Sequence, residues 1–394
     1  MAIEQFVNNA NSTLSVAANT SQTTITVTSA TPFSAIGNFR IIIDSEYMLV
    51  TSGSGAVFTV TRAIEGTTAA SHGIGNTVTQ ILTNGGLLSI LCSIISPGGR
   101  LTLTSATPVM SADVTAVSNV FYDTYKSKII PINGALYEIA SNELKLTLDT
   151  TNHIGGSIYD IFAISSNNLA KLVTGPAWTS NTARNLAIQL NNGIWVNSGT
   201  LTHAYNNAVD YGSITANNGT YLGSVYCTDN GQTSMQFNPT PIATGANAFM
   251  ALYNAYNREI LNCISCDNTA SWSYQSTTWR GTNGSANNRV TVIDGLGQSP
   301  VSGYLSIAIQ TPSNISASIG ININSITATP TVVTIENTNN QTNWQIQVEQ
   351  SFKPTLGLNF YQGMEVTGSA APGNFYGLIA AGFQDHALII STSI

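Results

Sequence analysis

The chain has 394 residues, a length that corresponds to roughly two to four domains. Only 8% of the residues are charged, 43% are hydrophobic, and 12 Lys and Arg against 19 Asp and Glu give a formal net charge of −7. The hydrophobic content excludes a disordered chain, and the few scattered basic residues exclude the positive stripe by which proteins bind nucleic acid. Abundant Thr, Ser and Gly with few helix-forming residues favour an all-β protein.

Residues 1–96 are predicted to form a small β domain that ends in a short helix. The strands are indicated by alternating or β-branched runs that are separated by turns containing Gly or Asp. These runs cover residues 24–28, 39–43, 46–50 and 56–61.

Within this first domain, residues 37–79 carry a recognisable motif. A strand ending in Thr61-Arg62 precedes a turn with the sequence Glu65-Gly66-Thr67-Thr68-Ala69-Ala70-Ser71-His72. The segment resembles small N-terminal β domains of bacteriophage tail proteins, and the match covers about 40 residues. The resemblance implies that residues 1–96 attach the protein to the tail or the capsid of a virion.

A short helix is predicted over residues 84–95, because its apolar residues recur at helical spacing. Asn84 is a candidate N-cap, and Pro97-Gly98-Gly99 ends the helix. The apolar stripe either packs on its own domain or forms a neck where three chains meet. The second interpretation makes four residues candidate oligomer contacts, namely Leu87, Ile90, Leu91 and Ile94.

Residues 97–133 form a connector with the sequence PGGRLTLTSATPVMSADVTAVSNVFYDTYKSKIIP over residues 97–131. This sequence resembles a recurring segment in virion structural proteins of tailed bacteriophages, known as tail fibre or minor tail proteins. Parts of residues 249–290 look similar to the same family. The resemblance implies a structural role in a virion.

Residues 134–325 are predicted to form a β-sandwich or jelly-roll body, and residues 326–394 a C-terminal β segment. Alternating apolar runs with Gly and Asn turns recur along the whole body. Residues 249–258 fit a helix and a strand equally well by periodicity. A strand is predicted there because the flanking segments are β-like.

Enzymatic chemistry is not indicated by any motif, so we expect neither catalysis nor a cofactor. Gly-x-Ser-x-Gly is absent, and no two of the four histidines have metal-ligand spacing. Cys263 and Cys266 have the spacing of half a zinc site, but no second pair exists, so buried thiols and no metal are expected. Polysaccharide cleavage needs two carboxylates across a groove, which only geometry can reveal, and the repeating β-helix pattern typical of degrading spikes is missing.

Aromatic side chains among Asn, Ser and Thr are candidates for contact with a host glycan. Trp272, Tyr274 and Trp279 are the residues concerned, and strand alternation places the first two rings on one face. The alternative is that these aromatic residues fill the core.

The pattern and the resemblance together predict a bacteriophage virion structural protein, most specifically a tail fibre or minor tail protein that contacts the host surface. The first alternative is a head decoration or head fibre protein, and a less favoured one is a polysaccharide-degrading tailspike. Expected partners are other virion proteins, two further copies in a homotrimer and a host surface glycan, without nucleic acid or membrane insertion. The first residues lack the pattern of a signal peptide, so assembly in the host cytoplasm is expected.

Overall fold

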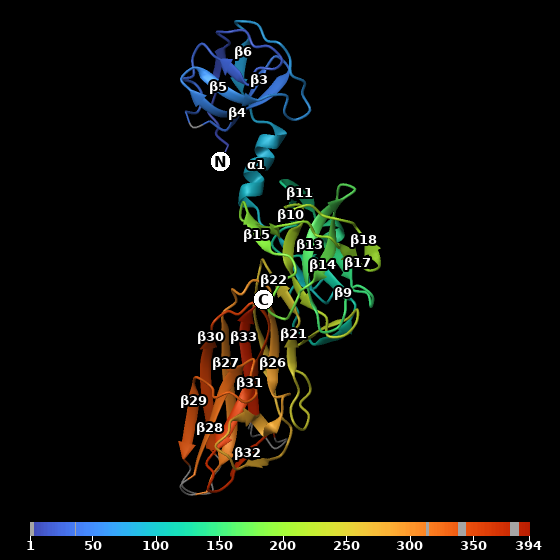
Figure 1. The fold of residues 1–394 in the computed structure, drawn as a ribbon, viewed down its shortest axis with the longest axis vertical. Helices are drawn as coiled ribbons and strands as arrows, with labels where there is room; N and C mark the ends of the chain where they lie inside the picture. The colour runs from blue at the N-terminus through green and yellow to red at the C-terminus, as the bar shows by residue number, and fades with distance from the viewer. Residues whose placement is uncertain (1–3, 36, 313–314, 338–343, 379–385) are drawn as a thin grey trace. The chain divides into compact units, whose positions relative to one another are not determined.

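The computed structural model describes residues 4–35, 37–312, 315–337, 344–378 and 386–394. The chain divides into two compact units, Met1–Ile95 with Gly134–Leu136, and Ser96–Asn133 with Tyr137–Ile394 (Figure 1). Strands form nearly all of the regular structure in the described ranges, so the prediction of an all-β protein is confirmed. The expected boundary at residue 96 lies beside the division between the units, while those at residues 133 and 325 stay predictions.

The first unit is built on one sheet with the strand order β1-β6-β3-β4-β5-β2. The bounds are β1 Asn11–Thr13, β2 Thr24–Thr26, β3 Phe39–Ile43, β4 Glu46–Ser54, β5 Val57–Thr61 and β6 Thr77–Gln80. Alternation in β3 buries Phe39, Ile41 and Ile43 on one face. Phe33 closes this core, with its ring centroid 5.7 Å from that of Phe39 and 5.3 Å from that of Phe58.

The helix α1 spans Asn84–Ile94 and confirms the helix predicted here. Its N-cap is Thr83 instead of Asn84, because the Thr83 hydroxyl accepts a hydrogen bond from the N–H of Gly86 at 3.2 Å. The carboxylate of Glu65 accepts from the N–H of Gly85 at 3.0 Å, which places a negative charge at the positive end of the helix dipole. No helix in the described ranges has the length and apolar character needed to cross a membrane.

The second unit begins with a sheet of strand order β12-β9-β7, followed by a larger sheet of order β15-β16-β19-β13-β14-β17-β18 with β22 beside β19. The bounds in the first sheet are β7 Gly99–Thr102, β9 Asn119–Thr124 and β12 Glu143–Thr147. Those in the larger sheet are β13 Ile158–Ser166, β14 Leu169–Ala177, β15 Ile188–Asn191, β16 Ile194–Asn197, β17 Tyr205–Asn206, β18 Val209–Asp210, β19 Thr220–Tyr226 and β22 Leu252–Asn254. The strands β10 Ile129–Ile132 and β11 Ala135–Glu138 form a separate two-stranded sheet, and β11 begins in the Gly134–Leu136 segment assigned to the first unit. The 3-10 turn η1 Ala140–Asn142 follows.

Two further sheets complete the second unit, with orders β29-β28-β31-β26-β21-β20-β8 and β23-β33-β27-β32-β24. β25 pairs with β31 in the first, and β30 pairs with β27 in the second. The bounds in the first are β8 Val114–Val117, β20 Thr233–Gln236, β21 Ala248–Met250, β25 Arg280–Gly281, β26 Arg289–Asp294, β28 Ser316–Ile323, β29 Val333–Asn337 and β31 Gly357–Thr367, with the 3-10 turn η2 Thr282–Gly284 after β25. Those in the second are β23 Ile260–Ser265, β24 Trp272–Tyr274, β27 Val301–Gln310, β30 Trp344–Phe352, β32 Gly373–Tyr376 and β33 His386–Ser393.

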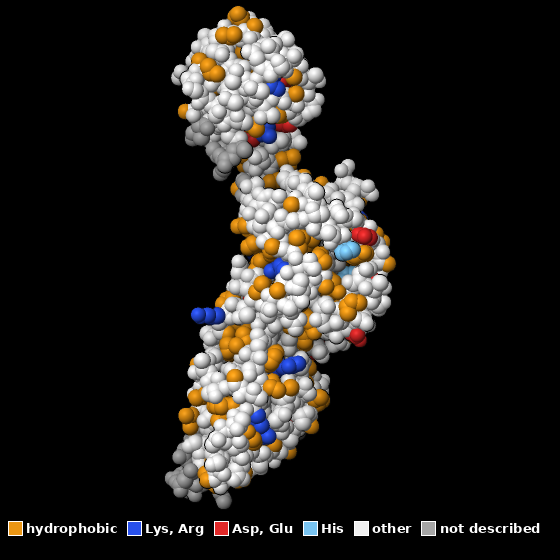
Figure 2. Space-filling view, viewed as in Figure 1, with side chains coloured by type: hydrophobic (Ala, Val, Ile, Leu, Met, Phe, Trp, Pro, Cys, Tyr) orange, Lys and Arg blue, Asp and Glu red, His pale blue; other side chains and the backbone are white. Residues whose placement is uncertain are grey.

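These last two sheets pack face to face as a β-sandwich. A Cβ atom added to Gly303 of β27 would lie 2.9 Å from Cδ1 of Ile321 of β28. One added to Gly363 of β31 would lie 3.3 Å from Cδ1 of Leu305 of β27. The strands β21 and β22 confirm the strand interpretation for residues 249–250 and 252–254, whereas residues 255–258 of the predicted strand have no regular structure. The face of the molecule in Figure 2 is mostly uncharged, with a few isolated Lys, Arg, Asp and Glu side chains.

Gly223 of β19 lies where the strand packs closely against Tyr253 and Leu101, so adding a side chain there tests the packing. A Cβ atom there would lie 1.9 Å from the carbonyl oxygen of Tyr253 and 2.6 Å from Cδ1 of Leu101. Gly223→Ala is therefore expected to destabilise the second unit by at least about 3 kcal/mol, measured by calorimetric unfolding of the full chain. Gly368→Ala is the matched control, since its Cβ would make only ordinary contacts with Ile315. Equal unfolding temperatures of the two variants would contradict this packing.

Candidate functional site

Trp272, the first predicted glycan contact, is a core residue. Its side chain is only 9% exposed, and its ring stacks on Phe375 with a centroid distance of 6.1 Å. Its indole N–H donates to Oε2 of Glu365 at 2.8 Å. Trp272 therefore fills the core, which was the alternative for these aromatic residues, and its ring is not open to a glycan. Alternation shows which side chains share a face of a strand, but not which face the rest of the chain covers.

Tyr274 and Trp279 are both half-buried, and they flank the turn between β24 and β25. The hydroxyl of Tyr274 donates to the carbonyl oxygen of Thr278 at 2.5 Å. The guanidinium carbon of Arg280 lies 3.7 Å from the centroid of the Tyr274 ring, so one ring face is covered by a cation–π contact. The role of these two residues in glycan contact stays a prediction.

Glu365 explains why Trp272 and Arg280 converge in the sandwich. Arg280 donates from Nε to Oε1 of this buried carboxylate at 2.8 Å, and its Nη2 lies 2.7 Å from the same oxygen. Burial raises the pKa of Glu365 to about 7, and the positive charge of Arg280 opposes that rise. The indole and the guanidinium therefore satisfy a buried acid, which is a structural task.

Two buried histidines each contact a threonine hydroxyl, as the base of a hydrolytic triad would. His386 accepts at Nδ1 from the backbone N–H of Asp267 at 3.1 Å, and its Nε2 lies 3.3 Å from Oγ1 of Thr282. Because Nδ1 accepts, the proton of the neutral ring is on Nε2, which cannot take a proton from the hydroxyl. Burial lowers the pKa of His386 to about 4, which keeps the ring neutral.

The second such contact is at His153, whose Nδ1 lies 3.0 Å from the backbone N–H of Asp149 and 3.1 Å from Oδ2 of the same residue. Nε2 of His153 lies 2.9 Å from Oγ1 of Thr174, whose hydroxyl donates to the carbonyl oxygen of Tyr205 at 3.3 Å. His153 and Thr174 are 0% and 1% exposed, so a substrate has no access to this pair. Thr174 and Thr282 are both fully buried, so neither hydroxyl is accessible to a substrate as a nucleophile.

Cys263 and Cys266 are both buried and free, as their interpretation as core thiols predicted. Burial raises the pKa of Cys266 to about 11 and that of Cys263 well above its usual range. Among the described residues, no group of three or more His, Cys, Asp and Glu side chains is placed to hold a metal ion.

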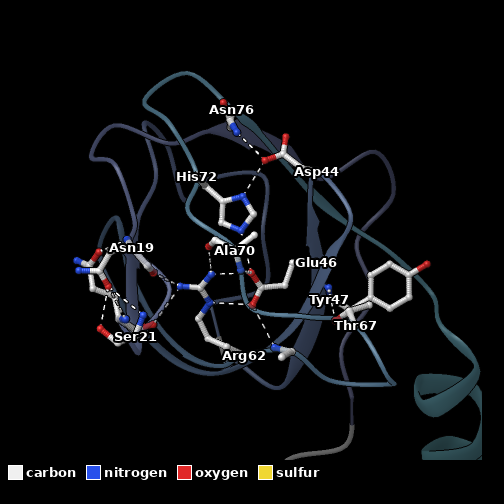
Figure 3. Close-up of polar contacts among 12 residues, drawn as sticks. Asn19, Ser21, Asp44, Glu46, Tyr47, Arg62, Thr67, Ala70, His72 and Asn76 are labelled. Atoms are coloured by element: carbon white, nitrogen blue, oxygen red, sulfur yellow. Dashed lines mark hydrogen bonds and ion pairs between the residues drawn. The ribbon is translucent and has the colours of Figure 1, made fainter.

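The motif of residues 61–72 builds a buried polar centre around Glu46 in the first unit (Figure 3). The Glu46 side chain is 0% exposed, and Arg62 binds it in a bidentate manner, from Nε at 2.8 Å and from Nη2 at 2.5 Å. Nε2 of His72 lies 2.9 Å from the same carboxylate, and the N–H of Ala70 donates to it at 2.9 Å. Arg62, Ala70 and His72 belong to the Thr61–His72 part of the motif segment. Their acceptor Glu46 also lies within residues 37–79, but it was not singled out from the sequence.

The wider network ties this centre to other loops of the first unit. Arg62 also donates to the carbonyl oxygens of Asn19 and Ala70. Nδ1 of His72 lies 2.7 Å from Oδ2 of Asp44, so the imidazole joins two carboxylates. Through these contacts Arg62 and His72 hold the irregular segment between them against β4.

The pKa of Glu46 reflects these contacts. Burial by itself would raise it, but hydrogen bonds from Arg62, Ala70 and His72 and the charge of Arg62 outweigh burial and lower the pKa from 4.5 to about 2. Because the pKa of Glu46 is lowered in the folded state, its ionised carboxylate contributes to the stability of the first unit, and this contribution is fully present above about pH 4.5. It is lost as the pH falls towards about 2.

No protein-family model and no curated protein matches the sequence. Among solved structures, a structure of the infectious bursal disease virus Gx strain is 9% identical, with 100% of this chain and 78% of that chain covered and a TM-score of 0.22. A Cry1Da tryptic core variant of Bacillus thuringiensis is 10% identical, with 78% and 53% covered and a TM-score of 0.14. Similarities at this level carry no argument about fold or function.

Arg62→Met tests the buried centre, because it removes the guanidinium and keeps most of the aliphatic stem. Glu46 would remain buried without its cation, so we expect the first unit to lose about 3–5 kcal/mol of stability. Hydrogen exchange of peptides from residues 39–80 in the full chain measures this loss. Lys126→Met, which removes an exposed cation, should leave the exchange unchanged. Equal protection in the two variants would show that the network contributes little.

Proposed function

We propose that the chain is a structural protein of a bacteriophage virion, most specifically a tail fibre or minor tail protein. The observation that supports this most is the Glu46 centre. The residues that carry the resemblance to phage tail proteins, Arg62, Ala70 and His72, are those that surround the buried carboxylate. The resemblance therefore rests on residues that maintain the fold of the first unit.

The chemistry of the remaining surface supports a binding and assembly role. Only 8% of the residues are charged, so contacts with partners rely on hydroxyl and amide hydrogen bonds and on apolar area, with little long-range electrostatic steering. In this proposal the first unit joins the particle, the second unit faces the host cell, and assembly takes place in the host cytoplasm. Its partners are other virion proteins and a glycan of the host surface.

Labelling of intact virions tests where on the particle the protein is located. Gold-conjugated antibody raised against residues 134–325 is expected to mark the tail in electron micrographs. Antibody absorbed with the purified chain provides the control for specificity. Label distributed over the capsid would make the chain a head decoration or head fibre protein, and particles without label would overturn the assignment to the virion.

The proposal includes a homotrimer held in part by α1. Leu87 and Ile94 of this helix are 45% and 74% exposed in the single chain, which leaves apolar surface for other copies to cover. Ile90 and Leu91, the other two predicted contacts, are half-buried. A helix of eleven residues is short for a free-standing coiled coil, so the neighbouring β structure would have to contribute to the interface.

Light scattering after size-exclusion chromatography tests the trimer. The unmodified chain is expected at three times the mass of one chain, and Leu87→Asp with Ile94→Asp is expected at the mass of one, because buried carboxylates would oppose association. Ile74→Asp with Leu190→Asp is the matched control, since both residues are exposed and lie outside α1. A monomeric unmodified chain, or an intact trimer of the α1 variant, would contradict this interface.

A further inference from the structure

The outer face of the sheet through β23, β33, β27 and β30 carries a groove that no predicted site included. Figure 1 shows β27, β30 and β33 among the strands of this part of the second unit. A cavity of about 450 Å³ adjoins one of about 250 Å³, and both are lined by Ser302, Ser351 and Ser391. Cavities of this combined size hold small ligands.

The strand register places three serines in one row across the groove. Ser302 of β27 pairs with Ser351 of β30 on one side and with Ser391 of β33 on the other. Ser391 pairs in turn with Asn262 of β23, whose side chain accepts a hydrogen bond from the Ser391 hydroxyl at 2.5 Å. Neighbouring strands are about 4.8 Å apart, so the serine hydroxyls span roughly 10 Å.

Two of these hydroxyls are available to a ligand. Ser302 and Ser351 are exposed, whereas Val301 and Gly303 on either side of Ser302 are buried in the sandwich. In the described part of the chain, neither Oγ atom has a hydrogen-bond partner. Each hydroxyl can both donate and accept, as the hydroxyls of a sugar also do.

The next row adds the apolar surface that a sugar ring requires. Tyr304 is half-buried beside Ile389, with which it pairs, and opposite Glu349 of β30. An aromatic ring offers apolar area to the C–H face of a pyranose while its hydroxyl stays in solvent. Ile260, which is 75% exposed, provides further apolar lining near the other end.

Charge in the groove is small and balanced. Arg258 lies in the lining of the larger cavity and Glu349 in that of the smaller one, with neutral side chains between them. A single cation opposite a single anion does not favour a polyanion such as nucleic acid. The row of hydroxyls also distinguishes this face from an apolar interface between subunits.

We propose that this groove binds a short segment of neutral or N-acetylated oligosaccharide, about two rings long, with the serine row contacting its hydroxyls and Tyr304 contacting a ring face. This site deepens the proposed function, since it rests on contact between the chain and a host surface glycan. It replaces Trp272, which is buried, as the centre of that contact.

The test uses an array of defined bacterial surface oligosaccharides, neutral and charged, probed with the full chain. Binding is expected to neutral or amide-bearing sugars. Ser302→Ala with Ser351→Ala should weaken binding to the strongest of these sugars at least tenfold, because two hydrogen bonds are lost. Ser52→Ala with Ser54→Ala removes two exposed hydroxyls from β4 and should leave the affinity unchanged. Tyr304→Leu should also weaken binding, by removing the ring.

Hydrogen exchange provides a second measurement that does not depend on a substitution. The bound sugar should protect residues 301–304, 349–352 and 389–393 in the unmodified chain. Binding only to polyanionic sugars, no binding to any sugar, or binding unaffected by the serine pair would overturn the site. Protection of the same peptides without sugar, lost on dilution, would identify the groove as a contact between copies and would also overturn it. Virion labelling is independent of these results, so failure of the groove leaves the structural assignment intact.

Discussion

The buried carboxylate held by one arginine is the interaction on which each unit depends. Arg62 binds Glu46 in the first unit, and Arg184 and Arg280 bind Asp160 and Glu365 in the second. Removing such an acid from water costs several kcal/mol unless a cation and further donors compensate. Each pair joins segments that are apart in the sequence, and removal of the arginine would leave an uncompensated buried acid.

The scarcity of charge has a second consequence at the surface. Hydroxyl and amide groups cover most of the exposed strands, and they recognise partners only at hydrogen-bond distance. The serines of β30, β27 and β33 are hydroxyl groups of this kind that lie in a regular row, because the sheet register aligns side chains that are far apart in sequence. The same register leaves an aromatic ring in the next row, so one regular surface combines the two kinds of contact that sugars use.

The histidines show why burial matters as much as composition. His153 and His386 each lie next to a threonine hydroxyl, an arrangement that sequence spacing did not suggest. The hydrogen-bond directions and the complete burial of both rings make them parts of the interior. Geometry that superficially resembles a catalytic pair here satisfies buried polar groups of the interior.

The sequence by itself determined the all-β class through its composition and the helix α1 through its apolar periodicity. It also indicated the strands within residues 249–254 through their β-like flanks, and the burial of Cys263 through the lack of a second cysteine pair. Its motif also pointed to Arg62 and His72, but not to Glu46, which the fold brings to them. Only the tertiary structure decided that Trp272 faces the core, since its partner Glu365 lies 93 residues further along the chain. The groove lined by Ser302, Ser351 and Ser391 could not be predicted from the sequence either. Residue spacing does not reveal which distant strands become neighbours or which face of a sheet remains exposed.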